Sequence, residues 1–257
     1  MKRGIPFSLC IEPVLQHMDF YDRIRAAADI GYDAVEFWNP SRVDLGRAAA
    51  VAAECGVTIA ACCVHDHRKN HLASDGAATA IPPSLERLAG AGIRSAIVMA
   101  GDARPGGDGM RLLMAENLKR LRDAAERTGV CLLLEPLNTL VDHKGYALDH
   151  TDQALELIRI ADSPCVKLLY DIYHMQIMEG NIIPTLRDAI GRIGHIHLAG
   201  VPSRHEPTSG ELNMPRVLHE LAALGYGGAV GMEYWPTLDT PRALRTELTA
   251  LRPHAGG

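Results

Sequence analysis

The feature of this sequence that most constrains its fold is a regular alternation of short apolar runs with longer amphipathic runs. Apolar or β-branched runs predict buried strands, and apolar residues three or four positions apart predict helices. Strands that alternate with helices pair in parallel, because each helix returns the chain to the same end of the sheet. The predicted strands span residues 6–11, 34–38, 57–65, 95–101, 130–135, 166–171, 195–200 and 229–234, and the predicted helices span 19–30, 44–54, 83–91, 110–128, 151–160, 215–224 and 241–251, with one more that begins at Pro184.

Eight such units in a row favour a closed barrel. The chain has 257 residues, and about 250 is typical of one (β/α)8 TIM barrel. Closure leaves no unpaired edge strand, and no break in composition divides the chain. We therefore expect an α/β fold, a single (β/α)8 TIM barrel domain over residues 1–257, in preference to an open doubly wound sheet.

Composition limits the partners of the chain. Apolar residues make up 47% of it, which is ample for a core, and the net charge is −5 with no block of Lys and Arg to follow a phosphate backbone. The first apolar run is too short for a secretory signal, and no run approaches the roughly 18 residues of a membrane helix. The six cysteines form no CxxC pair, which favours reduced thiols. We expect a cytoplasmic protein that binds neither nucleic acid nor a membrane and that is a possible homo-oligomer.

Potential metal ligands fall near the ends of four successive predicted strands. The strands concerned run into the strings LLLEPLN, LYDIYHMQIMEGN, HIHLAGV and GMEYWP. Active sites of TIM barrels lie at the carboxyl ends of the strands. Three carboxylates and one imidazole form a ligand set that suits a divalent cation. The four residues are Glu135, Asp171, His197 and Glu233.

Each of these residues also has a structural interpretation. Glu135 follows three leucines, and a buried carboxylate without a partner is costly, so a cation or a basic residue must balance it unless it lies on the surface past the strand end. Gly231, two residues before Glu233, leaves room for ligands. His195 and His197 point to one face of a strand, because side chains alternate. The deeper one fits a hydrogen-bonded core histidine, and His197 is the better ligand candidate.

Further polar residues lie near the same predicted strand ends. His174 is a candidate for substrate contact, although it could instead cap the following turn. Glu36, Trp38 and His65 are candidates for the pocket wall, and we expect Glu36 and His65 to meet the substrate. The loop GDARPGGDG, residues 101–109, lacks the spacing of phosphate-binding loops, which favours a mobile lid or turn over an anion site.

Four strings of the sequence resemble the hydroxypyruvate isomerase branch of the xylose-isomerase-like TIM barrels: LEPLN, YDIYHMQIMEGN, HIHLAGVPSRHEPTSGELN and GMEY. The match follows the chain in order over most of its length. The resemblance implies that one divalent metal is held by Glu135, Asp171, His197 and Glu233. It also implies that Glu135 and Glu233 serve as acid and base, and that the substrate meets His174, Arg204 and Glu206.

The resulting hypothesis is a metal-dependent isomerase that interconverts the keto and aldehyde forms of a small hydroxy-carbonyl acid, of the hydroxypyruvate and tartronate semialdehyde type. One glutamate removes a proton next to the polarised carbonyl and the other returns one at the neighbouring carbon. Arg204 suits a substrate carboxylate through a two-pronged hydrogen bond. The ligand set favours Mg²⁺ or Mn²⁺ and admits Co²⁺ or Zn²⁺.

Alternatives remain open from the sequence. Isomerases of this branch can carry Gln at the position of His197, so this residue moves the chain toward the ligand set of sugar epimerases. A ketose 3-epimerase would use the same two glutamates on one carbon, and a sugar-acid lyase or dehydratase would lose a fragment or water. A barrel that binds a sugar acid without turnover is a fourth possibility. An endonuclease IV-like role is disfavoured, because that chemistry needs several zinc ions and a basic face.

Overall fold

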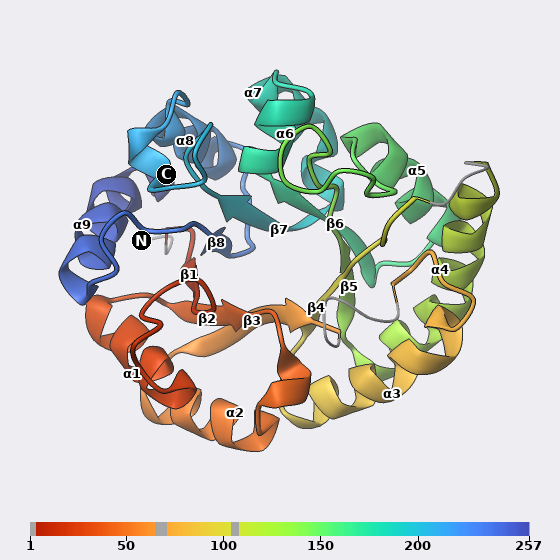
Figure 1. Ribbon diagram of the computed structural model, residues 1–257, viewed down its shortest axis with the longest axis horizontal. Helices are drawn as coiled ribbons and strands as arrows, with labels where there is room; N and C mark the ends of the chain where they lie inside the picture. Colours follow the sequence, from red (N-terminus) through yellow and green to blue (C-terminus); the bar gives the residue numbers. More distant parts are fainter. Residues whose placement is uncertain (1–3, 65–70, 104–107, 257) are drawn as a thin grey trace.

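The computed structural model describes residues 4–64, 71–103 and 108–256. Within these residues, parallel strands form a closed barrel in chain order, and the last strand pairs with the first (Figure 1). The strands are β1 (Phe7–Cys10), β2 (Ala34–Phe37), β3 (Thr58–Cys63), β4 (Ser95–Val98), β5 (Cys131–Leu134), β6 (Val166–Asp171), β7 (Ile193–Leu198) and β8 (Val230–Met232). The predicted (β/α)8 TIM barrel is therefore confirmed.

Helices surround the barrel and cover the outer face of its strands (Figure 1). Successive helices pack against one another as well as on the strands, as expected when each helix returns the chain to the starting end of the barrel. The helices are α1 (Phe20–Ile30), α2 (Leu45–Glu54), α3 (Ala77–Gly90), α4 (Asp108–Thr128), α5 (Thr151–Ala161), α6 (Ile172–Met178), α7 (Ile182–Ala189), α8 (Met214–Ala223) and α9 (Pro241–Leu251).

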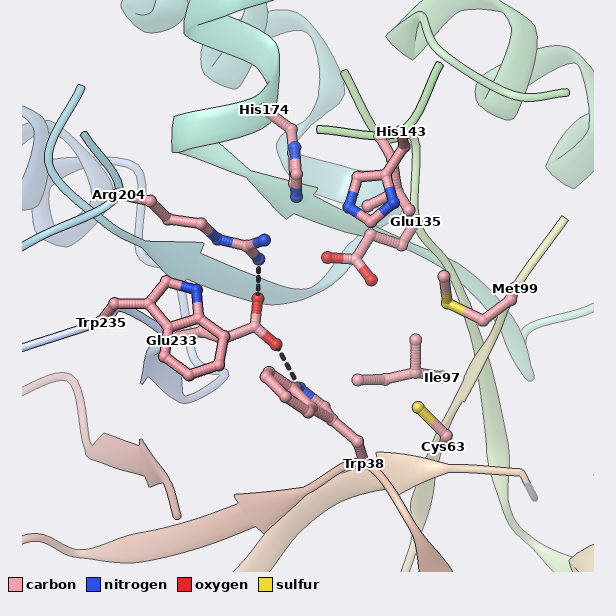
Figure 2. Close-up of a pocket in the computed structure, with 11 residues that line it drawn as sticks. Trp38, Cys63, Ile97, Met99, Glu135, His143, His174, Arg204, Glu233 and Trp235 are labelled. Atoms are coloured by element: carbon pink, nitrogen blue, oxygen red, sulfur yellow. Dashed lines mark hydrogen bonds and ion pairs between the residues drawn. The ribbon is translucent and has the colours of Figure 1, made fainter. Parts of the chain in front are cut away.

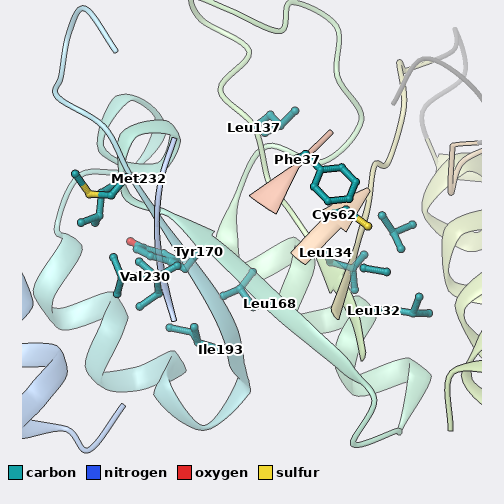
Figure 3. Close-up of a cluster of buried hydrophobic side chains, with 14 of the residues drawn as sticks. Phe37, Cys62, Leu132, Leu134, Leu137, Leu168, Tyr170, Ile193, Val230 and Met232 are labelled. Atoms are coloured by element: carbon teal, nitrogen blue, oxygen red, sulfur yellow. The ribbon is translucent and has the colours of Figure 1, made fainter. Parts of the chain in front are cut away.

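Side chains of the strands alternate between two hydrophobic clusters. Leu132 and Leu134 of β5 belong to the large cluster between the barrel and its helices (Figure 3), whereas Leu133 belongs to a smaller cluster inside the barrel. In β6, Leu168 faces the helices and Leu169 faces the interior. This two-residue period is the geometry of a β-strand.

The same period aims the polar residues at the strand ends. Glu135 follows Leu133 by two positions, and Asp171 follows Leu169 by two, so both carboxylates continue the inward-facing rows. The apolar residue of each pair closes the barrel interior below, and the carboxylate lies above it. The strand pattern thus places charged groups together at one end of a packed barrel.

Capping residues lie at the ends of several helices. Asp19 precedes α1 and accepts a hydrogen bond from the backbone N–H of Tyr21 at 2.9 Å. Gly31 ends the same helix with φ = +114°, a conformation that costs glycine little. Thr240 accepts from the N–H of Ala243 at the start of α9. These caps satisfy backbone groups that the helices leave free.

The segment after β6 differs from its prediction. We expected a loop where the structure has α6, which begins directly after Asp171. The Asp171 carboxylate accepts hydrogen bonds from the N–H groups of Tyr173 at 2.7 Å and His174 at 3.2 Å. Asp171 is therefore the N-cap of this helix. As a result His174 lies in the first turn of a helix instead of a loop.

Helix α3 also begins earlier than predicted. Pro82 and Pro83 suggested a start at residue 83, because proline is favoured in the first turn of a helix. The structure places both prolines inside α3, which begins at Ala77. Ala77 and Ile81 are fully buried. Burial of this apolar face outweighs the hydrogen bonds lost at the prolines.

Two predicted segments extend beyond the described residues. The predicted strand 57–65 ends at Cys63 in the structure, and His65 lies outside the described residues. The loop 101–109 lies partly outside them as well. None of the helices in the described part of the chain combines the length and apolar character needed to cross a membrane.

Candidate active site and metal centre

A pocket of about 220 Å³ opens at the carboxyl ends of the strands. Figure 2 shows carboxylate, imidazole and guanidinium groups that point into it from one side, while sulfur and aliphatic side chains close the other. The residues that line the pocket are Trp38, Cys63, Ile97, Met99, Glu135, Leu137, His143, His174, Arg204, Glu233 and Trp235. This is the end of a TIM barrel that carries the active site.

The structure brings the four predicted metal ligands together. One ligand atom from each residue lies within 4.8 Å of the ligand atoms of the other three, and all four residues are buried. The residues come from successive strands or the positions just beyond them: Glu135 after β5, Asp171 at the end of β6, His197 in β7 and Glu233 after β8. Residues 26 to 98 positions apart in the chain thus meet because neighbouring parallel strands end at the same end of the barrel.

Two atoms of this group are buried and lack hydrogen-bond partners among the described residues: Oε1 of Glu135 and Nδ1 of His197. Nδ1 of His197 lies 3.4 Å from Oε1 of Glu135 and 3.5 Å from Oε2 of Glu233. Buried polar atoms normally have partners, and a site for an ion is one explanation for an unpaired atom. Three carboxylates with one imidazole also fit the donor preferences of a divalent cation, so the residues fit a metal.

The opposite nitrogen of His197 has a partner. Its Nε2 lies 3.0 Å from Oε2 of Glu36, and Nε2 of His195 lies 2.8 Å from the same oxygen. Burial alone would raise the pKa of Glu36, but His195 and His197 outweigh it and hold that pKa at about 2. Glu36 is therefore ionised and accepts from both imidazoles.

This arrangement places Glu36 away from the lining of the pocket. The residue faces the barrel interior, but its carboxylate lies beside Gly231 and His197, since a Cβ atom at Gly231 would be 2.1 Å from Oε1 of Glu36. It is not part of the lining of the pocket, and its side chain is 2% exposed. The strands of a barrel are tilted, so a residue at the end of β2 lies deeper than one just past β8. Glu36 contacts His195 and His197, and its expected contact with the substrate stays a prediction.

Burial and charge shift the proton affinities of the ligand group. Burial raises the pKa of Asp171 to about 7, and Arg204 and His197 counter this only in part. Burial also acts to raise the pKa of Glu233, but His197 and Arg204 hold it well below its usual range. For His197, the nearby carboxylates of Glu233 and Glu36 outweigh burial and raise the pKa well above its usual range. Without a metal, the group therefore retains protons at neutral pH.

Two residues hold the carboxylate of Glu233. Nη2 of Arg204 donates to Oε2 at 2.5 Å, and the indole N–H of Trp38 donates to Oε1 at 2.6 Å (Figure 2). Arg204 has a positive φ of 54°, which is uncommon for a residue with a side chain. Its carbonyl accepts from the N–H of Trp235, and its own N–H donates to Gly200. These bonds fix the backbone that directs the guanidinium into the pocket.

His174 is held by a network from the loop after β5. The Oδ1 atom of Asn138 accepts from the backbone N–H groups of Val141 and Asp142, so its Nδ2 must be the atom that faces Nδ1 of His174 at 2.8 Å. Nδ1 of His174 is therefore the acceptor. Its Nε2, which has no hydrogen-bond partner among the described residues, carries the hydrogen toward the pocket.

The charge state of His174 follows from its surroundings. Its side chain is fully buried, and burial together with the nearby Arg204 lowers the pKa well below its usual range. A neutral imidazole with one N–H aimed at a pocket can donate a hydrogen bond to a substrate oxygen. It is not a source of positive charge at neutral pH.

The fold and the site now permit comparison with known proteins. A profile of the family described as xylose isomerase-like TIM barrel matches residues 24–254. The chain belongs to this family.

Similarity extends to named enzymes within the xylose isomerase-like TIM barrels. The 2-oxo-tetronate isomerase of Cupriavidus necator is 34% identical over 250 residues, which cover 92% of this chain and 94% of the relative. The hydroxypyruvate isomerase of Escherichia coli is 31% identical over 258 residues, 93% of this chain and 96% of the relative.

Solved structures of the same family have the same architecture. A protein from Brucella melitensis, described as an AP endonuclease of family 2, aligns with a TM-score of 0.88 at 26% identity and covers 96% of this chain and 99% of its own. The 3-keto-D-glucoside 4-epimerase of E. coli aligns with a TM-score of 0.83 at 26% identity, over 96% and 98% of the two chains. Together with the sequence relatives, these findings identify this xylose isomerase-like chain as an enzyme, an isomerase.

The remaining predicted site residues of this xylose isomerase-like barrel lie in different places. Arg204 and His174 line the pocket. Glu206 does not, because its Oε1 accepts from the backbone N–H and the hydroxyl of Thr237, at 2.8 and 3.0 Å. The expected substrate contact of Glu206 stays a prediction, and in the structure one of its carboxylate oxygens is bound by Thr237. His65 lies outside the described residues, and its role stays a prediction.

Several pocket residues were not identified from the sequence. His143 lies in an irregular loop, and its ring packs edge-on against that of His174, with 5.3 Å between their centroids. Trp235 contacts Trp38 across the pocket mouth. Loops have no periodicity that would reveal which side chains turn inward. The available signal was that His143 and Trp235 follow β5 and β8, because the loops after the strands carry the active site in TIM barrels.

Proposed function

We propose that this isomerase interconverts small 2-oxo acids with the isomers in which the carbonyl and the adjacent hydroxyl have exchanged places, and that it requires one divalent metal ion. The observation that carries the proposal is the meeting of two buried glutamates, Glu135 and Glu233, with Arg204 at one pocket. Two carboxylates can pass protons to and from neighbouring carbons, and a guanidinium can bind an acid group.

The substrate class follows from the pocket and from the relatives. Hydroxypyruvate and 2-oxo-tetronate, which the relatives' names specify, both have a carboxylate, a ketone and a hydroxyl on the next carbon. The pocket of about 220 Å³ is smaller than the 300–1,000 Å³ usual for drug-sized ligands, which supports a substrate of three or four carbons. Arg204 is the group that would bind the carboxylate.

The residues that would hold the ion are Glu135, Asp171, His197 and Glu233. A hard, mostly carboxylate set supports Mg²⁺ or Mn²⁺ before Co²⁺ or Zn²⁺. Bound there, the ion would supply Lewis acidity toward a carbonyl and its neighbouring hydroxyl. Asp171 also caps α6, so the residue that would bind the ion is fixed by the backbone of a helix.

The chain's own groups account for the proton transfers. One of Glu135 and Glu233 would take the proton from the carbon that bears the hydroxyl, and the other would return a proton at the former carbonyl carbon. The hydroxyl proton would pass to the former carbonyl oxygen, which completes the exchange of the two groups. The Nε2–H of His174 would donate to a substrate oxygen on which negative charge develops. Trp38 holds Glu233 by its indole N–H, which fixes the carboxylate relative to the pocket.

A sugar epimerase is the second candidate. The similarity to a 3-keto-glucoside 4-epimerase at 26% identity supports it, as does His197 in the ligand group. In that reaction, the same glutamates would exchange a proton at one carbon from opposite faces. The two proposals differ in the need for Arg204, because a free ketose has no carboxylate for the guanidinium to bind.

A substrate panel separates these functions. The protein, stripped of metal by a chelator and then supplied with Mn²⁺, is incubated with hydroxypyruvate, 2-oxo-tetronate and a free ketose, and the products are identified by NMR and mass. We expect Mn²⁺-dependent isomerisation of the acids with no change in mass. Turnover of the ketose alone would favour the epimerase, and a change in mass would favour a lyase or dehydratase. A DNA duplex with an abasic site tests the nuclease function named for the Brucella relative.

We further propose that residues 1–257 form one domain that acts in the cytoplasm without nucleic acid or membrane partners. The net charge of −5 supports the absence of a nucleic-acid partner. A homo-oligomer is consistent with the exposed side chains of Leu140, Val141 and Leu238 in loops after β5 and β8. Sedimentation equilibrium of the purified protein measures the oligomeric state. A gel-shift assay with duplex DNA tests whether the protein lacks a nucleic-acid partner.

A further inference from the structure

A second buried polar cluster lies directly below the proposed metal ligands. It consists of Glu36 from β2 and His195 from β7, and it reaches the ligand group through His197. Glu36 and His195 are 1% and 3% exposed, and neither lines the pocket. The path from Glu36 and His195 to the pocket in this structure runs through His197.

The hydrogen bonds of this cluster fix the hydrogen positions on His197. Oε2 of Glu36 lies 2.8 Å from Nε2 of His195 and 3.0 Å from Nε2 of His197. One carboxylate oxygen that lies between two ring nitrogens accepts from both when each Nε2 carries a hydrogen, whereas a protonated oxygen could donate to only one of them. In neutral His197 the lone pair is then on Nδ1. That is the atom that faces Glu135 and Glu233.

The neighbouring strand leaves the space that this arrangement needs. Gly231 of β8 pairs with His197 in the sheet. A Cβ atom at Gly231 would lie 2.1 Å from Oε1 of Glu36 and 2.7 Å from Cδ2 of His197, closer than real Cβ contacts. The glycine therefore leaves room for both side chains. Glu36 can therefore occupy this position only because residue 231 has no side chain.

We propose that Glu36, with His195 as its second donor, is a positioning residue that fixes the tautomer and tilt of His197 so that Nδ1 is free to bind the metal. The inference rests on the metal centre of the proposed function. It assigns a role in that centre to Glu36 and His195, which are not among the four proposed metal ligands. Groups that orient a metal-bound histidine through its other nitrogen typically change metal affinity about 10- to 100-fold when removed.

The test measures Mn²⁺ affinity and stoichiometry by isothermal titration calorimetry, without an activity assay. The variants are Glu36→Gln, which keeps an oxygen acceptor, and Glu36→Met, which has none. Glu220→Gln is the matched control, because Glu220 is a buried carboxylate of α8 that pairs with Arg187 on α7, away from the pocket. Far-UV circular dichroism and thermal unfolding confirm that each variant is folded.

We expect one Mn²⁺ per native chain, an affinity about 10- to 100-fold weaker for Glu36→Met, a smaller loss for Glu36→Gln, and no change for Glu220→Gln. Native affinity in a folded Glu36→Met variant would overturn the inference. Two ions per native chain, one of which is lost in Glu36→Gln, would overturn it as well, since the cluster would then be a second metal site. If the native protein binds no Mn²⁺, the proposed function fails together with this inference.

Gly231→Ala provides a test that removes no polar group. The added methyl would displace the Glu36 carboxylate or the His197 ring, so we expect weaker Mn²⁺ binding in this variant too. Combined with Glu36→Met, it should add little further loss, because both changes disturb the same hydrogen bond. Additive losses in the double variant would contradict the proposed role of Glu36. If Glu36→Met is unstable, native Mn²⁺ affinity in a folded Gly231→Ala variant would contradict that role by itself.

Discussion

The guanidinium of Arg204 is paired with the carboxylate of Glu233 inside the pocket, with 2.5 Å between Nη2 and Oε2. The same guanidinium nitrogen lies 4.0 Å from Oδ2 of Asp171. Arg204 therefore balances part of the negative charge of the group that we propose as the metal site. A buried cluster of carboxylates without such a cation would be costly. Its position also makes Arg204 the group best placed to bind a substrate carboxylate.

Replacement of Arg204 should discriminate between acidic and neutral substrates. We expect Arg204→Gln to lower kcat/KM for a 2-oxo acid about 10- to 100-fold, because a hydrogen bond to a charged group contributes about 1.5–3 kcal/mol. Arg204→Lys should restore part of the loss, since it keeps the charge but not the two-pronged geometry. Steady-state kinetics measure the effect. Arg216→Gln, on the outer face of α8, is the control.

An equal loss with a neutral ketose would contradict this role. It would indicate that Arg204 acts through Glu233, for example by holding that carboxylate, and not through the substrate.

The two glutamates should both be required for turnover. Glu135→Gln and Glu233→Gln keep the size of the side chain but cannot accept a proton from carbon, so we expect kcat to fall by about 10²–10⁴-fold in each. Since these residues are also proposed ligands, the variants must be compared at saturating Mn²⁺, with bound metal quantified. Near-normal turnover of either variant with metal bound would argue against the proton transfers proposed for that residue.

His174 should act as a neutral hydrogen-bond donor. His174→Gln can place an amide N–H toward the pocket, whereas His174→Phe cannot, so the Gln variant should retain more activity. Because burial lowers the pKa of His174 well below its usual range, its imidazole should not titrate near neutral pH. Histidine NMR signals recorded across the neutral range test this directly. A His174 signal that titrates near its usual pKa would show that the residue is charged in the pocket.

Metal binding should be favoured by rising pH. The pKa of Asp171, raised to about 7 from 3.8, means that the folded metal-free protein holds a proton that the unfolded chain has lost between these values. Stability of the metal-free form from this group is therefore lost as pH rises from about 4 to about 7. His197, whose pKa is also raised, contributes stability that is present below its unfolded pKa and is lost as pH rises through its higher folded pKa.

The measurable consequence is a pH-dependent effect of Mn²⁺ on Tm. Both residues must release their protons to bind the ion, so the rise in Tm at a fixed Mn²⁺ concentration should grow between about pH 5.5 and about pH 8. Asp171→Asn should lose most of this effect. An increase in Tm that is the same at every pH would show that these groups are not coupled to the ion.

Much of this fold follows from local pattern. The alternation of Leu133 with its outward-facing neighbours, and the caps at Asp19 and Gly31, are properties of short segments, and the structure agrees with them. Helix α6 was missed because its start depends on the side chain of Asp171 as N-cap, and from the sequence this residue was predicted only as a metal ligand. In the structure, the residue caps the helix and also belongs to the ligand group.

The sequence predicted that site residues in strands lie at the end of the barrel. It did not predict how deep each side chain lies inside the barrel. Asp171 and His197 lie in strands and meet as expected. Glu36 also lies in a strand, but its carboxylate lies beside Gly231 and His197 instead of in the pocket, and no single strand encodes this depth in a barrel of tilted strands. Glu206 and His143 lie in loops, whose path depends on tertiary contacts such as the bonds from Thr237.

The most direct test of the account is a crystal structure of the Mn²⁺-loaded protein with anomalous diffraction data. We predict a single anomalous peak with Glu135, Asp171, Glu233 and Nδ1 of His197 at about 2.0–2.3 Å from it. A peak at any other place, or an ion-free cluster in which Arg204 still pairs with Glu233 at saturating Mn²⁺, would contradict the central claim that these four residues share one metal ion.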